Sequence, residues 1–375
     1  MKAAQKAMDE SRYSDAEQSL RIAVKEAEKL APGDRRLDVS LSSLAAVLFY
    51  QGKYDEAERS YLQAMAILER TLGREHLRMT ESLTGLSVIY QMQGKYKEIE
   101  PLLARSLAIR EKVLGPDHPD VATSLSNLGN LYSSQGKSTQ AEVVYRRALA
   151  ILERVYGPDH LVVASTLNNL GVLSGSQGNS VEAERLLKRA LMIREAALGS
   201  KHTDVATSLD NLGAFYNSQG KPAEAEFLLM RALAIQEAVR GSMHADVAIT
   251  LGHLAASYEA QGRSVEAALL IERSLAIWEK TLGPDDMRVA GTLSNLARIY
   301  SAEGQYAKAE ALQRRSLAIR EKIRGPMDPE LTTDLESYAS LLRKMGWNPE
   351  AIEIEGRVNS IRTKHSSADR SVPDR

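Results

Sequence analysis

The sequence predicts an all-α protein, an α-solenoid of antiparallel helical hairpins, and three observations support this fold class. Apolar residues recur at helical spacing throughout the chain. Aromatic residues make up only 5% of it, while Ala and Leu are abundant, which favours closely packed helices over sheets. The 375-residue chain also repeats every 42 residues without a gap, in lines that begin at Asp34, His76, His118, His160, His202, His244, Asp286 and Asp328.

Each line opens with a segment that is expected to form one helix, here called the first helix of a repeat. Counted from the start of a line, positions 8 and 11 are Leu in every complete line, and position 12 is always small. Positions 8, 11, 12 and 15 share one helical face, so we expect this stripe to be buried. Position 19 is always Gly, a residue that commonly ends helices.

The remainder of each line predicts a second helix of about twenty residues, because apolar residues again follow the helical period. In the line from His118 the apolar series runs from Ala141 to Val155, and the Gly157-Pro158 pair ends it. Pro101 is expected in the first turn of its second helix, where a missing N–H costs little.

Position 12 indicates close approach of two helices, since Gly, Ala and Ser share this column. Gly in a helix interior costs about 1 kcal/mol relative to Ala. We therefore expect Gly129→Ala to be neutral or stabilising, and Gly129→Leu to cost roughly 1–3 kcal/mol through overpacking.

The ends of the chain depart from the repeat, which suggests four parts. Residues 1–33 match a partial N-terminal repeat, residues 34–327 seven complete repeats, residues 328–364 a C-terminal capping hairpin, and residues 365–375 a disordered tail. In the capping hairpin Glu355 and Arg357 are expected to replace apolar groups. The partial repeat leaves open whether the chain starts within a repeat or was cut from a longer parent.

Composition narrows the possible partners and compartments. The formal net charge is −1 with 26% charged residues of both signs, so we expect neither nucleic acid nor a membrane as partner. The chain contains no Cys, which excludes thiol catalysis and thiolate metal sites. No signal peptide or long apolar run is present, so a cytoplasmic location is expected.

Repeated His and Glu residues do not predict a catalytic or metal site. His76, His118, His160, His202 and His244 recur 42 residues apart, so they would follow the solenoid and not converge on one ion; helix capping or loop packing is the better account. Glu at position 36 is invariant in a last helical turn, and we expect it to pair with a nearby Arg or Lys. We predict no enzyme, no metal and no cofactor.

The columns of Leu, Gly and Ala resemble those of the tetratricopeptide repeat. The segments "GPDHPDVATSLSNLGNLY" and "GKYKEIEPLLARSLAIREKVLG" are similar to the 42-residue repeats of kinesin light chain and related bacterial proteins. This resemblance implies a right-handed superhelix whose first helices line a concave channel for extended peptides. The heptad coiled coil that joins kinesin light chain to its motor has no counterpart here, so motor binding is not implied.

A second stripe of the first helix, at positions 6, 9, 10, 13, 16 and 17, faces the channel by the family's geometry; we call it the variable stripe. Asn recurs at position 10, where its amide can pair with the N–H and C=O of a bound peptide, although bonding along its own helix is an equal alternative. The predicted peptide-binding residues are Asn127, Asn169, Asn211 and Asn295, with Asn130, Asn168, Asp210, Asn217, His253 and Arg298.

These observations predict a non-catalytic scaffold that binds an extended peptide segment of a partner protein. The alternative is a structural or self-association module that packs against a neighbouring domain or another copy. The partner's identity is not predicted, and weak self-association is compatible with either reading.

Overall fold

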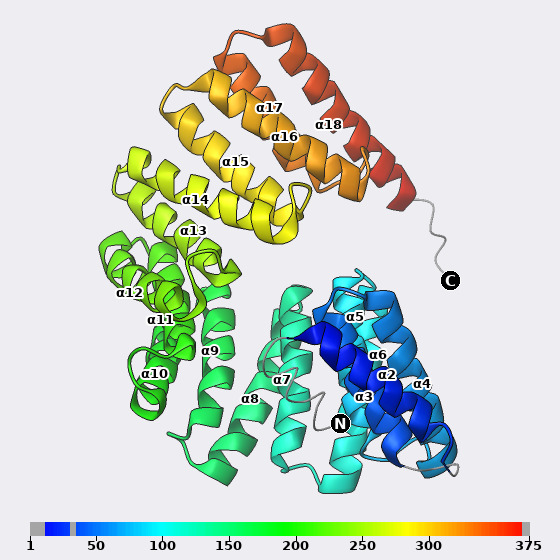
Figure 1. Cartoon of the computed structure of the whole chain (residues 1–375). Coiled ribbons are helices and arrows are strands. Elements are labelled where there is room, and N and C mark those ends of the chain that lie inside the picture. The colour runs from blue at the N-terminus through cyan, green and yellow to red at the C-terminus, as the bar shows by residue number, and fades with distance from the viewer. Residues whose placement is uncertain (1–11, 31–34, 370–375) are drawn as a thin grey trace. The chain divides into compact units, whose positions relative to one another are not determined.

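The computed structural model describes residues 12–30 and 35–369, which form 17 helices and no strand (Figure 1). The first helices are α3 (Arg35–Tyr50), α5 (Met79–Met92), α7 (Pro119–Ser134), α9 (Leu161–Ser176), α11 (Thr203–Ser218), α13 (Ala245–Ala260), α15 (Met287–Ala302) and α17 (Leu331–Lys344). The second helices are α2 (Tyr13–Ala27), α4 (Tyr54–Leu72), α6 (Tyr96–Leu114), α8 (Ser138–Tyr156), α10 (Ser180–Leu198), α12 (Pro222–Arg240), α14 (Ser264–Leu282), α16 (Tyr306–Arg324) and α18 (Asn348–Asp369). The predicted all-α hairpin fold is confirmed.

Within each unit a first helix packs on the second helix of its own repeat, as α7 does on α8 and α11 on α12, and the next first helix packs on that second helix in turn, as α9 does on α8 and α13 on α12. The stripe at positions 8, 11 and 12 forms this contact, as expected: Leu125, Leu128 and Gly129 of α7 are all buried. Val121 and Ala122 extend the buried face toward the start of the helix. The core of each unit is therefore a series of small apolar clusters along its stacked helices.

Glycine ends both helices of a repeat, because each turn needs a backbone with positive φ. Gly136 follows α7 with φ +70°, and Gly157 follows α8 with φ +90°. Both angles lie in the region that side-chain-bearing residues rarely adopt. The predicted ends of the two helices are confirmed at these residues.

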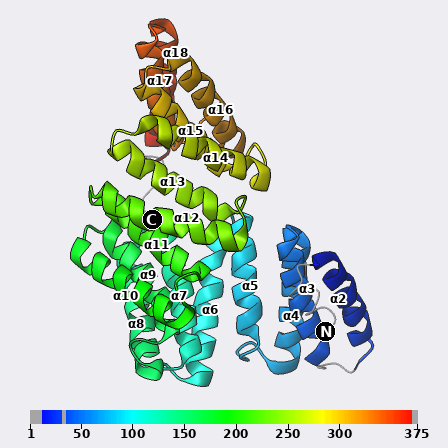
Figure 2. The same cartoon turned by 60° about the vertical axis from the view of Figure 1, so that its left-hand side comes forward.

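The chain divides into two compact units, Met1–Leu186 and Leu187–Arg375, which are described separately below. The boundary falls within α10, at the middle of a second helix. Within each unit first and second helices alternate along the chain (Figure 2). Among the described helices none has the length and apolar character needed to cross a membrane.

Three local expectations need correction. Pro101 is the sixth residue of α6 and lies in its second turn, so it removes one interior helical hydrogen bond. Arg357 does not replace an apolar group, since it lies in the column that holds Arg in most repeats and pairs with Glu321. Finally, a Cβ on Gly129 would lie only 2.5 Å from Cε1 of Tyr145, so Gly129→Ala is not expected to be neutral.

At the C-terminus α18 continues to Asp369 and so includes five residues of the predicted tail. Glu355 is bound by Arg343 at 2.8 Å within the last hairpin. At the N-terminus α2 supplies a second helix without a described first helix before it. The limits of the four parts remain predictions, and residues 1–11, 31–34 and 370–375 lie outside the described part of the chain.

Candidate functional site

Four of the repeated histidines are N-caps of first helices, and His76 makes the same contact three residues before α5 begins. Nδ1 of His118 accepts a hydrogen bond from the backbone N–H of Asp120 at 3.1 Å, and this contact recurs at the other four repeated histidines. Asp286 takes the same role through a carboxylate oxygen, 2.8 Å from the N–H of Arg288. An acceptor at this position satisfies a donor that the first turn of the helix leaves unpaired. The capping account of these residues is confirmed.

In five repeats the Glu at position 36 pairs with an Arg of the next repeat, whereas Glu69 pairs with Arg74 in the loop after its own helix. Glu111 at the end of α6 pairs with Arg147 of α8 at 2.6 Å, and Glu279 at the end of α14 pairs with Arg315 of α16 at the same distance. Each pair links the second helices of adjacent repeats, and the Arg charge offsets the unfavourable position of an anion in a last helical turn. The predicted pairing of this column is confirmed, and it is structural.

In the first unit, Asn130 and Asn169 bond to each other. The Asn169 amide donates to Oδ1 of Asn130 at 3.0 Å, and the Tyr145 hydroxyl donates to the same oxygen at 2.6 Å. Asn169 therefore bonds across to the neighbouring first helix, which is neither of the two predicted roles. Asn127 is half-buried and makes no side-chain hydrogen bond among the described residues. Asn168 is only 5% exposed, so it does not present a contact surface.

In the second unit, Asp210 and Asn217 of α11 are committed to α13. The Asp210 carboxylate is buried. It accepts a hydrogen bond from Oγ1 of Thr250 at 2.7 Å and lies 3.1 Å from Nδ1 of His253. The Asn217 amide donates to the backbone oxygen of His253 at 2.8 Å and accepts from Ser257. These predicted peptide-binding residues thus hold two first helices together, and Asp210 is not accessible.

Asp210 also changes the titration of His253. Burial by itself lowers the pKa of His253, but the hydrogen bond and negative charge of Asp210 outweigh it and raise the pKa above the ordinary value of 6.5. At a given pH the His253 imidazole of α13 is therefore more often protonated than an ordinary histidine.

Three predicted residues of the second unit come together in one groove. His253, Asn295 and Arg298 line a depression of about 630 Å³ across α13 and α15. Asn295 and Arg298 also line a second depression of about 580 Å³ across α15 and α17, so the two adjoin. Asn211, on α11, is half-buried and lines neither of these two depressions. The groove therefore follows three successive first helices.

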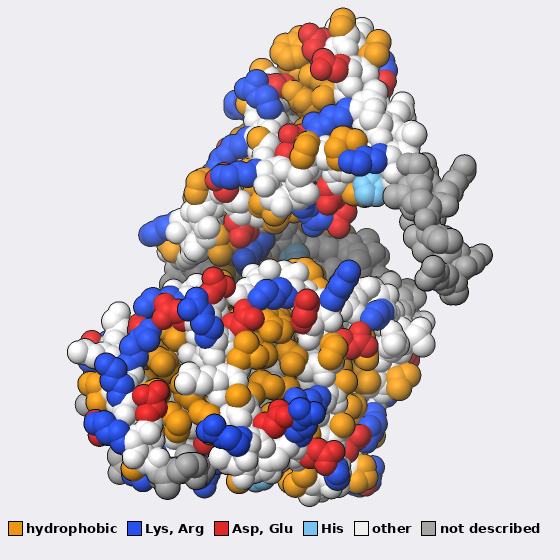
Figure 3. All heavy atoms as spheres, turned by 90° about the vertical axis from the view of Figure 1, so that its right-hand side faces the viewer, with side chains coloured by type: hydrophobic (Ala, Val, Ile, Leu, Met, Phe, Trp, Pro, Cys, Tyr) orange, Lys and Arg blue, Asp and Glu red, His pale blue; other side chains and the backbone are white. Residues whose placement is uncertain are grey.

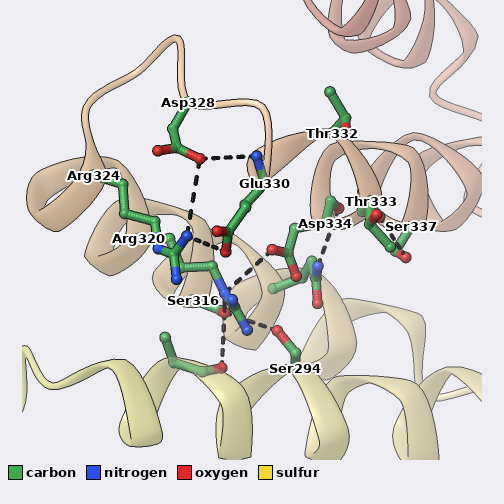
Figure 4. Close-up of polar contacts among 12 residues, drawn as sticks. Ser294, Ser316, Arg320, Arg324, Asp328, Glu330, Thr332, Thr333, Asp334 and Ser337 are labelled. Atoms are coloured by element: carbon green, nitrogen blue, oxygen red, sulfur yellow. Dashed lines mark hydrogen bonds and ion pairs between the residues drawn. The ribbon is translucent and has the colours of Figure 1, made fainter. Parts of the chain in front are cut away.

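Most charges along this groove are paired. Arg298 binds Glu259 through two hydrogen bonds of 2.7 Å each, and this raises the pKa of Arg298. Asp334, which the sequence analysis did not select, lies in the floor 3.3 Å from Arg320 (Figure 4). Burial raises the pKa of Asp334 although Arg320 opposes the shift. Lys344 contacts the Ser301 hydroxyl at 3.4 Å and pairs with no carboxylate among the described residues.

Two interior helical glycines, Gly252 of α13 and Gly291 of α15, line the same groove. A Cβ added to either would meet no atom within 4 Å. Unlike Gly129, these glycines are not required by packing inside the fold, yet each costs helix stability. Because neither glycine has a side chain, another backbone can approach the groove closely at these two positions.

Charged side chains of both signs are mixed on one face of the molecule. On the face that Figure 3 presents, Lys and Arg side chains lie among Asp and Glu side chains in each unit. This agrees with the balanced net charge of −1.

The chain is similar to several solved repeat structures. BtubC (BKLC) from P. vanneervenii is 28% identical over 61% of this chain and 92% of that one, with a TM-score of 0.54. A Podosopora anserina protein described as a kinesin light chain with nearly identical TPR-like repeats is 29% identical over 55% and 98%, with a TM-score of 0.50. The apo form of the quorum sensor NprR from B. thuringiensis shares the fold alone, at 13% identity over 96% of each chain and a TM-score of 0.66.

No functionally curated protein matches the chain. The tetratricopeptide repeat profile matches residues 36–112, 80–154, 136–196, 172–238, 246–322 and 288–358. These matches cover most of the chain. The chain belongs to the tetratricopeptide repeat family, with repeats of the 42-residue, kinesin light chain-like type.

Proposed function

We propose that this protein is a non-catalytic scaffold that holds an extended peptide segment of a partner protein against its first helices. The tetratricopeptide repeat is a scaffold fold that supports protein interactions. The observation that carries the proposal is the groove of the second unit, which crosses α13, α15 and α17. A surface that passes over three successive helices suits an extended chain better than a compact ligand.

The chemistry of the groove supports a backbone ligand. Asn295 is exposed at the junction of the two depressions and makes no side-chain hydrogen bond among the described residues. Its amide can donate to a peptide C=O and accept from a peptide N–H. Gly252 and Gly291 leave room for that backbone, and the paired charges around them add little selectivity for a charged segment.

A peptide selection on three forms of the protein tests the proposal. Gly291→Leu places a side chain in the groove, and its Cβ meets no atom of the fold within 4 Å. Gly356→Leu is the matched control, because Gly356 is an exposed helical glycine of the same unit outside the groove and is equally uncrowded. Circular dichroism of each variant confirms that its helices are intact.

Peptides enriched on the wild type should bind Gly356→Leu equally and lose binding to Gly291→Leu. Asn295→Ala should weaken the same peptides by roughly three- to tenfold, the effect of removing one neutral hydrogen bond. Equal binding to wild type and Gly291→Leu, or no enriched peptide at all, would overturn the proposal.

A second candidate, self-association, rests on exposed apolar side chains of the second helices. Phe227 of α12 is 70% exposed, and Val265 and Leu269 of α14 are 68% and 60% exposed. The two helices are neighbours, because Glu226 of α12 bonds with Arg263 at 2.9 Å just before α14 begins. Grouped apolar surface of this kind marks interaction sites when it is extensive.

Sedimentation velocity at increasing concentration decides this candidate. Phe227→Asp should abolish any concentration-dependent mass, whereas Val143→Asp, at the corresponding position of α8 and 63% exposed, should not. A wild-type protein that remains monomeric at every concentration would eliminate self-association.

A further inference from the structure

The second helices α12 and α14 carry the same exposed charge pattern. An acid comes first, a large apolar residue follows three positions later, and a base follows four positions after that. On α12 these residues are Glu224, Phe227 and Arg231, and on α14 they are Glu266, Leu269 and Arg273. Residues with this spacing share one face of a helix. Each helix therefore presents a stripe with an acidic end, an apolar centre and a basic end, here called the charge-ended stripe.

The apolar centres of the two charge-ended stripes are open to solvent. Phe227 and Leu269 are 70% and 60% exposed, and Met230 and Val265 widen the apolar area at 51% and 68% exposed. An ion pair joins the two helices, so the stripes are neighbours. Exposed apolar side chains grouped on neighbouring helices indicate an interaction surface.

The other described second helices do not combine these three features. At the central position they hold Gln18, Arg59, Pro101, Val143, Arg185, Ala311 and Glu353. Among these only Val143 is large and apolar, and Gln140 precedes it where α12 and α14 have an acid. The charge-ended stripe is therefore a local property of α12 and α14 and not a general feature of the repeat.

The order of residues in the stripe is complementary to itself. When two such stripes pair antiparallel, the acidic end of each faces the basic end of the other and the apolar centres meet. A two-fold axis across the helices produces this pairing, because it reverses the helix direction in the second copy. Glu224 is exposed and makes no ion pair among the described residues, and Arg231 remains 34% exposed beside Glu195 of its own chain. Both groups can therefore bind an opposite charge on another copy.

We propose that two copies of this chain pair through α12 and α14 about a two-fold axis and form a closed dimer. Phe227 and Leu269 form the apolar centre of the interface, and the charged ends fix its antiparallel direction. None of the stripe residues lines the groove over α13, α15 and α17, so each copy keeps its groove free for one partner segment. The inference rests on the self-association candidate of the proposed function and adds the direction and the limit of the assembly.

Charge reversal at one end of the stripe tests the proposal. Glu224→Lys places a base where the second copy presents a base, whereas Glu98→Lys makes the same change at the corresponding position of α6, which has Pro101 at its centre. Both glutamates are exposed and make no ion pair among the described residues, so both variants should fold. In sedimentation equilibrium the wild type and Glu98→Lys should reach the mass of a dimer and no more. Glu224→Lys should dimerise roughly tenfold more weakly, because two-fold symmetry introduces the change at both ends of the interface.

Ionic strength separates a charge effect from a folding defect. In about 1 M salt, where the Debye length is roughly 3 Å, Glu224→Lys and the wild type should dimerise equally. Equal dimerisation of these two proteins at low salt would overturn the antiparallel arrangement while leaving self-association intact. A mass that grows beyond two copies would overturn the closed dimer, and a wild type that is monomeric at every concentration would refute self-association as well. The peptide selection tests the groove separately from all of these outcomes.

Discussion

Gly129→Ala should destabilise the hairpin of α7 and α8. The added Cβ would lie 2.5, 2.7 and 2.8 Å from Cε1, Cδ1 and Cζ of Tyr145, all well inside normal contact. The Tyr145 ring is 2% exposed, and its hydroxyl is held 2.6 Å from Oδ1 of Asn130. The ring therefore cannot move aside without loss of that hydrogen bond.

Two opposing effects determine the size of the change. Overpacking a buried site costs about 1–3 kcal/mol, and replacing an interior helical Gly with Ala returns about 1 kcal/mol. Weakening the Tyr145 hydrogen bond adds about 1 kcal/mol to the cost. The net expectation is a loss of about 1–3 kcal/mol in the free energy of unfolding.

Urea denaturation followed by circular dichroism measures this loss, and hydrogen exchange of α7 and α8 localises it. Gly252→Ala is the control, because its Cβ meets no atom within 4 Å and it should raise stability by up to about 1 kcal/mol. A Gly129→Ala protein as stable as Gly252→Ala would refute this reasoning.

Three further predictions concern one helix cap and two contacts between helices. His118→Ala should lower the melting temperature by the equivalent of about 1 kcal/mol, whereas His118→Asp should retain stability because a carboxylate can accept the same bond; exchange rates at the start of α7 check both. The Asp210–His253 pair should make its full contribution to the free energy of unfolding below pH 6.5. This contribution should disappear as the pH rises through the raised pKa of His253. Urea midpoints of wild type and His253→Gln between pH 5.5 and 8.5 should therefore converge at high pH. Asn217→Ala should cost roughly 1–3 kcal/mol, because two polar partners on α13 lose their bonds, and it should increase exchange in α13.

The hairpins, their ends and their caps could be predicted from the sequence because they depend on residues close together in the chain. The stripe that includes Leu125 and Leu128 is buried as its spacing indicates. The turns at Gly136 and Gly157 and the cap at His118 are also local, each satisfied within a few residues. Pro101 was misplaced because α6 begins at Tyr96, only two residues after Gly94, so Pro101 falls beyond the first turn.

Contacts between particular side chains of different helices could be identified only from the tertiary structure. The repeat gives a column its usual residue type, but it does not state which ring meets Gly129 or which carboxylate meets His253. Asn130 and Asn169 are 39 residues apart, and their hydrogen bond turns two expected ligand contacts into a structural one. Burial of Asp210 has the same origin, because its exposure depends on the residues that the next helix presents.

The sequence by itself therefore determined the repeat, the helices and the family, since each follows from short-range spacing repeated along the chain. Only the tertiary structure decided which residues of the variable stripe remain accessible. Asn127 and Asn295 line surfaces with their amides unbonded among the described residues, while Asn169 and Asn217 are bonded to neighbouring helices. The physical reason is that a polar side chain pairs with whatever donor or acceptor lies nearest, and that partner belongs to another repeat.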